Sequence, residues 1–300
     1  MAAVILVAGA TGNLGLRIVK ALCNNSAEVR VVVRPTSDAA KIKTLENLGV
    51  KIYKVNTWTV EELKVACEGV SCVVSVLAGL REVVIDAQKI LLDAAIAAGV
   101  PRFIPSDYSL DFTKFSYGKN RNLDLRREFH EYLDQKSIAS TSIFNGAFAD
   151  LLADEMPFIL TKKKMVIYWG NKERRWAFTT MDNTAQYTAN VALDPSTPRY
   201  LRIAGDQISP KKAREIASSV YHKKFTLLRL GGKGLLGFMI KMARLFNPAK
   251  NELYPAWQGM QYMHNMIDER SKIEKLDNNR YAEIRWTKIK QVLEQNKVDN

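Results

Sequence analysis

The first half of the chain alternates short apolar runs with longer amphipathic segments. Each apolar run is bounded by glycine, proline or polar residues, which is typical of a β-strand. Between the runs, apolar residues recur at helical spacing, as in Ile85, Ile90, Leu91, Ala94 and Ala95. The pattern predicts strands at 4–8, 29–33, 51–55, 72–76 and 102–105. It predicts helices at 15–24, 39–48, 59–67 and 83–98.

The predicted strands are nearly continuous apolar runs rather than alternating ones, as residues 3–7 and 29–33 illustrate. Strands with this composition are buried on both faces, under helices that connect them. The sequence therefore predicts the α/β class, with a Rossmann-type, doubly wound parallel sheet.

The regular alternation continues to about residue 150 and then loosens. Leu125, Phe129 and Leu133 predict another amphipathic helix, and a strand follows at 141–144. The later predicted elements are a strand pair at 164–169 and 175–179, helices at 183–193 and 210–220, and a strand at 200–203. We expect a nucleotide-binding domain at 1–155, to which 177–203 returns. We expect a smaller α+β substrate lobe at 156–176 and 204–300.

A glycine-rich loop follows the first predicted strand directly and opens the first helix. In this order, Gly9 permits a tight turn, Gly12 lets the backbone approach a pyrophosphate, and Gly15 allows close packing of the helix on the sheet. Free N–H groups at the helix start then face the phosphate charge. The loop predicts dinucleotide binding by Gly9, Thr11, Gly12, Asn13, Leu14 and Gly15.

The end of the second strand distinguishes between the two nicotinamide cofactors. An NAD-binding chain places Asp or Glu there to bind the ribose hydroxyls. This chain has Arg34 at that position, with no carboxylate immediately after it. A guanidinium can bind a 2′-phosphate through paired, charge-assisted hydrogen bonds, which favours NADP(H). Lys43 on the next helix can add positive charge, although a solvated helix face explains it equally well.

Composition and charge exclude several other classes of protein. The chain has 300 residues, of which 47% are hydrophobic and 25% charged, as in ordinary globular proteins. Its three cysteines have no disulfide or metal-site spacing, which fits a cytoplasmic location. No metal site and no membrane span are expected. The net charge of +13 lies almost wholly in the second half, yet no recognition motif accompanies it, so we do not expect nucleic-acid binding.

Three motifs together resemble one protein family. They are the glycine loop of residues 9–15, Val33-Arg34-Pro35-Thr36, and the segment of residues 102–108, which contains Pro105-Ser106-Asp107. With residues 137–148 and Asp194-Pro195-Ser196-Thr197, they are similar to the NmrA-like and isoflavone-reductase-like branch of the atypical short-chain dehydrogenases. The resemblance implies a Rossmann domain, NADPH binding and, in many members, reduction of small phenolic or quinone compounds. Other members of the family sense the cofactor and regulate a partner protein.

The resemblance also implies a catalytic position at which this chain departs from the pattern. In the reductases, a lysine on the helix before the 137–148 segment commonly handles the proton, and that position here is Arg126. Arginine keeps its proton in proteins and is a poor general acid. Arg126 can still stabilise an anionic oxygen while water supplies the proton. Pairing with a carboxylate is the structural alternative.

Further candidates follow the predicted strands or share the Arg126 helix. Tyr108 follows a strand's carboxyl end, where ligands gather in open α/β sheets, although it can equally be a packing residue. His130 is one helical turn from Arg126 and titrates in a range suited to acid–base catalysis, although a structural histidine is commoner. We also expect cofactor contacts from Leu77, Ala78, Gly79, Ser106, Asn145 and Phe148.

Large apolar residues of the second half, such as Trp169 and Trp257, can line an aromatic-substrate pocket or form that lobe's core. The basic, amphipathic run 233–246 can also present a face to a membrane surface or a partner.

The sequence thus predicts an NADPH-dependent reductase of a small aromatic, quinone or carbonyl compound. The alternative is a non-catalytic NADP(H) sensor that acts through a protein partner, which the arginine at position 126 motivates. A homodimer and a regulatory partner both stay open.

Overall fold

In the computed structural model, which describes residues 2–152 and 156–298, a six-stranded sheet organises the first half of the chain. Its order is β3-β2-β1-β4-β5-β6, and all of its pairs are parallel. The strands are β1 (Val4–Ala8), β2 (Glu28–Val33), β3 (Lys51–Lys54), β4 (Cys72–Ser75), β5 (Arg102–Ile104) and β6 (Ala139–Ser140). This order is that of a doubly wound dinucleotide-binding sheet, so the predicted fold class is confirmed.

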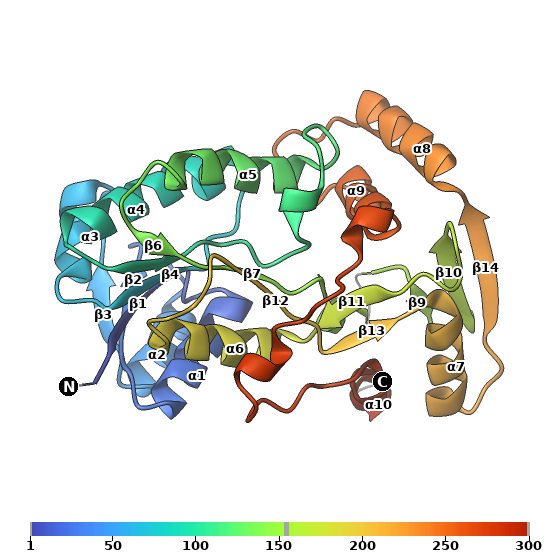
Figure 1. Cartoon of the computed structure of the whole chain (residues 1–300), viewed down its shortest axis with the longest axis horizontal. Coiled ribbons are helices and arrows are strands. Elements are labelled where there is room, and N and C mark those ends of the chain that lie inside the picture. Colours follow the sequence, from blue (N-terminus) through green and yellow to red (C-terminus); the bar gives the residue numbers. More distant parts are fainter. Residues whose placement is uncertain (1, 153–155, 299–300) are drawn as a thin grey trace.

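Helices cover both faces of this sheet (Figure 1). On one side lie α3 (Val60–Cys67), α4 (Gln88–Ala97) and α5 (Arg121–Leu133), and on the other α1 (Asn13–Asn24), α2 (Ala39–Asn47) and α6 (Met181–Leu193). The helix predicted at 83–98 begins with a π-helical segment, Glu82–Ala87, before α4. The double cover explains why the strands carry apolar residues on both faces.

The later strands lie in smaller sheets. β7 (Ser142–Phe144) pairs with β12 (Tyr200–Arg202). The remaining strands are β8 (Ala147–Phe148), β9 (Ile159–Leu160), β10 (Met165–Trp169), β11 (Trp176–Thr179), β13 (Asp206–Ile208) and β14 (Thr226–Gly231). We call these strands, together with α7 (Pro210–Tyr221), α8 (Lys233–Phe246), α9 (Ala256–Met266) and α10 (Ile289–Val298), the second lobe.

The prediction that β10 and β11 pair with each other is wrong. β10 pairs with β9 and β14, whereas β11 pairs with β8 and β13. Both strands nevertheless pack against one apolar core, where Val166 and Trp176 are buried together. The apolar pattern identified the two strands, but contacts with distant parts of the chain determine which strands they pair with.

The predicted domain division stays a prediction, and its boundary residue 155 lies outside the described residues. Several contacts bear on it. α6 packs on α1 and β12 lies beside β7, within the predicted return segment. The stretch after α9 also reaches the first domain, because the Asp277 carbonyl accepts a hydrogen bond from the Tyr187 hydroxyl of α6, at 3.0 Å.

Candidate functional site

In the loop between β1 and α1, two of the three glycines are required by contacts within the protein itself. Gly9 has φ +90°, and a Cβ atom there would lie 2.6 Å from the carbonyl oxygen of Val76. A Cβ atom on Gly15 would lie 2.1 Å from the carbonyl oxygen of Gly9. Gly12 is less restricted, since its Cβ atom would meet only Gly9 oxygen, at 3.3 Å. Internal packing thus explains Gly9 and Gly15, while Gly12 borders solvent.

The first helix begins without a capping side chain. Its N-cap residue is Gly12, and its first turn contains no acidic residue. Within residues 2–152 and 156–298, the N–H groups of Asn13, Leu14 and Gly15 have no hydrogen-bond partner. Unpaired N–H groups and the positive end of the helix dipole form an anion-binding position.

Arg34 lies exposed just after β2, on the sheet edge next to the glycine loop's strand. Its backbone N–H donates to the Ser37 hydroxyl at 3.1 Å, which fixes the turn. Its guanidinium makes no hydrogen bond or ion pair with any described residue. The nearest following carboxylate, Asp38, instead caps α2 by accepting from the Lys41 N–H at 2.9 Å. The turn after β2 therefore leaves the Arg34 guanidinium available to a ligand. Lys43, on α2, is also exposed.

Arg126 bridges α5 and the segment that follows β5. Its Nε donates to the Ser106 carbonyl at 3.1 Å, and its Nη1 donates to the Asn122 carbonyl at 2.8 Å. It forms no ion pair with a described carboxylate, so the alternative of a simple carboxylate pair is wrong. Its Nη2 has no hydrogen bond within the described chain.

Tyr262 of α9 reaches the same place, which sequence reasoning missed by treating it as one of many large apolar groups. Burial raises the pKa of its hydroxyl, while the Arg126 cation and a hydrogen bond with the Asn122 side chain oppose that rise. No local signal marks this residue, because the groups that act on it, Asn122 and Arg126, lie far earlier in the chain, on α5. The site thus combines a guanidinium with a phenol from the other lobe.

His130 lies in a buried network rather than at an open site. Its Nε2 is 2.6 Å from Asp107 Oδ2 and its Nδ1 is 2.9 Å from Arg199 Nη2. Arg199 can only donate, so Nδ1 accepts and the Nε2–H donates to Asp107. Ser142 Oγ, 3.4 Å away, contacts the same Nε2, so these groups do not form a nucleophilic triad.

The Asp107 carboxylate is the charged centre of that network. Burial opposes its ionisation, but the attraction and hydrogen bond of His130 and a hydrogen bond with Ser142 outweigh burial and lower its pKa. Asp107 and Ser106 are adjacent, and Arg126 holds the Ser106 carbonyl. The His130 network therefore positions the segment on which Arg126 rests, and a direct catalytic role for His130 is not supported by its burial.

Tyr108 points away from this site. It packs in the core with Val74, Ile143 and Ala189, on the side of the sheet that α1 and α6 cover. Burial raises the pKa of its hydroxyl. This burial favours the packing interpretation, and a catalytic contact of Tyr108 stays a prediction.

The remaining predicted cofactor contacts follow the carboxyl ends of β4, β5 and β7, apart from Phe148, which lies in β8. Leu77, Ala78 and Gly79 follow β4, and Ser106 N–H donates to Gln88 Oε1 at 3.0 Å. Asn145 is fully buried, yet neither its amide nitrogen nor its amide oxygen has a partner in the described structure. Phe148 is half-buried against the apolar cluster that α1 and α6 form with the main sheet. Its contact with the cofactor stays a prediction.

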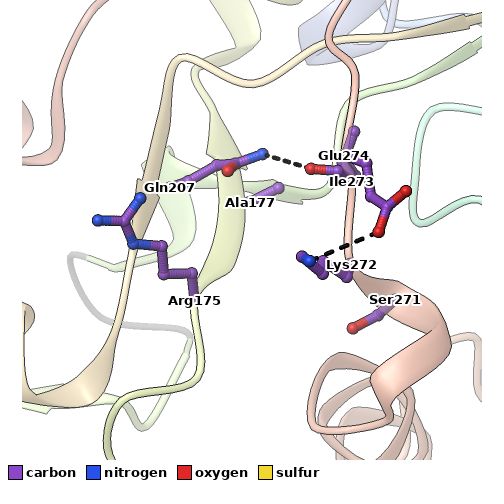
Figure 2. A pocket seen from close by; sticks show the side chains of 7 residues that line it. All are labelled: Arg175, Ala177, Gln207, Ser271, Lys272, Ile273 and Glu274. Atoms are coloured by element: carbon purple, nitrogen blue, oxygen red, sulfur yellow. Dashed lines mark hydrogen bonds and ion pairs between the residues drawn. The ribbon is translucent and has the colours of Figure 1, made fainter.

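A separate cavity of about 320 Å³ lies in the second lobe (Figure 2). It lies between β11 and β13 on one side and residues 271–274 on the other, where Gln207 Nε2 donates to the Ile273 carbonyl at 3.5 Å. None of the predicted site residues lines it. We therefore do not assign the cavity to the predicted cofactor site.

The model of the NmrA-like family matches residues 1–288. The chain belongs to the NmrA-like family. This finding confirms the resemblance seen in the sequence motifs.

Similar proteins of this NmrA-like chain include two enzymes of Arabidopsis thaliana. Pinoresinol reductase 1 is 29% identical over 207 residues, which cover 64% of this chain and 65% of that protein. Pinoresinol reductase 2 is 28% identical over 249 residues, which cover 77% of this chain and 78% of that protein.

Two solved structures share the fold of this NmrA-like chain. AtPrR2 with NADP+ and (+)pinoresinol superposes with a TM-score of 0.83 at 22% identity, covering 98% of this chain and 99% of that one. Isoflavone reductase gives a TM-score of 0.82 at 17% identity, with the same coverage.

Within the described residues, no helix has the length and apolar character needed to cross a membrane.

Proposed function

We propose that this chain is an NADPH-dependent reductase that transfers hydride to a small aromatic, quinone or carbonyl compound. The observation that carries the proposal is the unpaired Arg34 guanidinium beside an uncapped glycine-loop helix. The two positions offer positive charge for a pyrophosphate and for a ribose 2′-phosphate. The name of the similar AtPrR2 complex, which contains NADP+, supports the same cofactor.

The cofactor would supply the hydride, and the chain's own groups would bind and orient. Gly9, Gly12 and Gly15 would admit the dinucleotide backbone, and the N–H groups of Asn13 and Leu14 would face its phosphates. The buried, unpartnered amide of Asn145 supports a polar contact near the reacting ring, because an unpaired buried amide costs about 1–3 kcal/mol.

At the substrate oxygen, Arg126 would act as an electrostatic stabiliser. Two of its three nitrogens hold backbone carbonyls, which fixes the guanidinium plane and leaves Nη2 to donate. A fixed donor that retains its proton can stabilise developing negative charge, while water provides the proton. This arrangement suits acceptors such as quinones, whose reduced oxygen is a stable anion.

A non-catalytic NADP(H) sensor is the second candidate, and Arg126 itself favours it. An arginine in place of a titratable lysine would preserve a site's positive charge without its proton chemistry. Such a sensor binds the cofactor and turns over no acceptor. Assays of NADPH oxidation with a panel of quinones, aldehydes and enones distinguish the two candidates.

Replacing Arg34 with alanine should weaken NADPH binding by about 10- to 100-fold, because charge-assisted hydrogen bonds to a phosphate are lost. NADH binding should change little. Isothermal titration calorimetry of both cofactors measures the difference. Arg285→Ala is a matched control, since Arg285 is also exposed but lies near the carboxyl end of the chain. A wild-type preference for NADH, or binding of neither cofactor, contradicts the proposal.

Replacing Arg126 with alanine should lower kcat by about 10²- to 10³-fold with little effect on NADPH binding, because an oxyanion donor is lost. Arg126→Lys should retain much of the rate and should make it pH-dependent, since lysine can titrate. Steady-state rates across pH with the best acceptor test both variants. Equal rates for wild type and Arg126→Ala would remove Arg126 from the reaction.

A further inference from the structure

Helix α8 has two apolar faces, and only one of them packs against the protein. Leu236 and Ile240 are buried on Trp169 and on residues of α9. A Cβ atom on Gly237 would lie 3.7 Å from the His264 ring, so the helix also approaches α9 closely along this face. In Figure 1, α8 lies at the periphery of the second lobe, beyond α9. One face therefore anchors the helix, and the opposite face points outward.

The outward side, which we call the outer face of α8, consists of five large apolar residues. Their exposed fractions range from 37% to 78%, for Leu235, Phe238, Met239, Leu245 and Phe246. Relative to Leu235 they lie at i, i+3, i+4, i+10 and i+11, which is one side of a helix. Scattered exposed apolar residues are ordinary, but a contiguous stripe marks a surface that is covered in use.

The preceding strand β14 extends this apolar surface along the chain. Leu228 and Leu230 are 44% and 38% exposed. β14 pairs with β10 alone, so it is an edge strand, and only Gly232 separates it from α8. Seven of the ten exposed large apolar residues found in the described chain thus lie between positions 228 and 246.

The charged residues of β14 and α8 all carry the same sign. From Ile216 to Asn251 the sequence has seven Lys and Arg and no Asp or Glu. Lys241, on α8 itself, is exposed and has no ion-pair partner in the described chain. Lys233 pairs with Asp268, and Arg244 lies over the Trp257 ring at 5.3 Å. An apolar stripe on a helix whose own charged residues are all cations complements a surface that is apolar inside and anionic outside.

We propose that the outer face of α8 docks this protein onto an anionic phospholipid surface. Phenylalanine, leucine and methionine would enter the acyl boundary, while the flanking cations would contact the headgroups. A second copy of the chain is a poorer occupant, because it would bring two sets of the same cations together without a compensating carboxylate. The proposal does not depend on the cofactor or on turnover.

The helix would lie flat on the bilayer. Its 14 residues extend about 21 Å at 1.5 Å per residue, which is shorter than the hydrocarbon core. Since Leu236 and Ile240 stay buried in the protein, only the outer side would be immersed. This geometry places the second lobe, and not the glycine loop, against the membrane.

Sedimentation of the full-length protein with lipid vesicles tests the proposal. The wild type should bind vesicles of phosphatidylcholine containing one third phosphatidylserine, should bind pure phosphatidylcholine much less, and should dissociate as salt is raised. The double variant Phe238→Ser, Phe246→Ser should lose this binding. Lys241→Glu, which changes two charges, should weaken it by about thirtyfold. All these side chains are exposed, so the thermal transition should not move.

Val65→Ser and Lys64→Glu are matched controls, because both residues are exposed on α3 in the other lobe. Both should bind vesicles as the wild type does. The proposal is overturned if the wild type ignores anionic vesicles at low salt, or if the α8 variants bind as well as these controls. Light scattering adds a third outcome. A wild-type dimer that the phenylalanine variant converts to a monomer, without vesicle binding, would assign the face to a second copy instead.

Discussion

Gly15→Ala should reduce NADPH affinity by at least about 100-fold, because a loop displaced by about an ångström loses its alignment with the ligand. The added Cβ atom would lie 2.1 Å from the Gly9 carbonyl oxygen, which is backbone and cannot rotate away. The free energy of unfolding should also fall, by about 1–3 kcal/mol, as in other overpacked sites. Calorimetric titration and urea unfolding measure the two effects.

Gly259→Ala is the control for this prediction. Gly259 lies within α9, and a Cβ atom there would meet nothing within 4 Å. Alanine in a helix interior should stabilise the protein by about 0.5–1 kcal/mol and leave cofactor binding unchanged. If Gly15→Ala binds NADPH as tightly as this control does, the loop does not hold the dinucleotide.

Asp107→Ala should destabilise the protein by about 1–3 kcal/mol, since it leaves the buried Nε2–H of His130 without its acceptor. The Asp107 side chain is 1% exposed. Its pKa in the folded protein lies below the value of about 3.9 in an unfolded chain, so its contribution is present above that value. The contribution should disappear as pH falls through the folded pKa. Urea unfolding of both proteins at several pH values should show the difference narrowing in acid.

Asp134→Ala is the matched variant for the same network. Asp134 pairs with Arg199, the other partner of His130, at 2.8 Å, and its side chain is 55% exposed. Water replaces such a partner readily, so its loss should cost less than about 1 kcal/mol. Equal losses for the two aspartates would mean that burial does not govern this network.

Strands β1, β2, β4 and β5 of the main sheet were predictable because each is largely a buried apolar run bounded by turn residues. The short edge strand β6 was not predicted, since Ala139 and Ser140 form no apolar run. The glycine loop was predictable because the tight turn and the close helix packing require glycine at positions 9 and 15, directly after the first strand. The strand pairing in the second lobe was not predictable. β10 and β11 have similar patterns of apolar residues and differ only in the distant strands with which they pair. Sequence periodicity reports which face is buried, and it does not name the element that buries it.

Asp107 and Tyr108 show the same limit at the candidate site. Both follow the carboxyl end of β5, the edge at which ligands bind. Successive side chains of an extended segment point to opposite faces. Asp107 therefore meets His130 under α5, whereas Tyr108 enters the core on the α6 side. The sequence correctly placed both residues after the carboxyl end of β5. It could not show which face of the sheet each side chain points to, because that depends on where the helices pack.

The stretch that follows α9 constrains how this molecule can be divided. The Asp277 N–H donates to the Arg202 carbonyl beside β7, and Tyr281 and Trp286 pack against Tyr187 of α6. Asn183, also on α6, is bonded to the backbone of Arg285 and Thr287. Residues 277–287 thus form part of the wall of the half that contains the six-stranded sheet. A shortened recombinant fragment ending near residue 150 would lack that wall and should not yield an autonomous cofactor-binding unit.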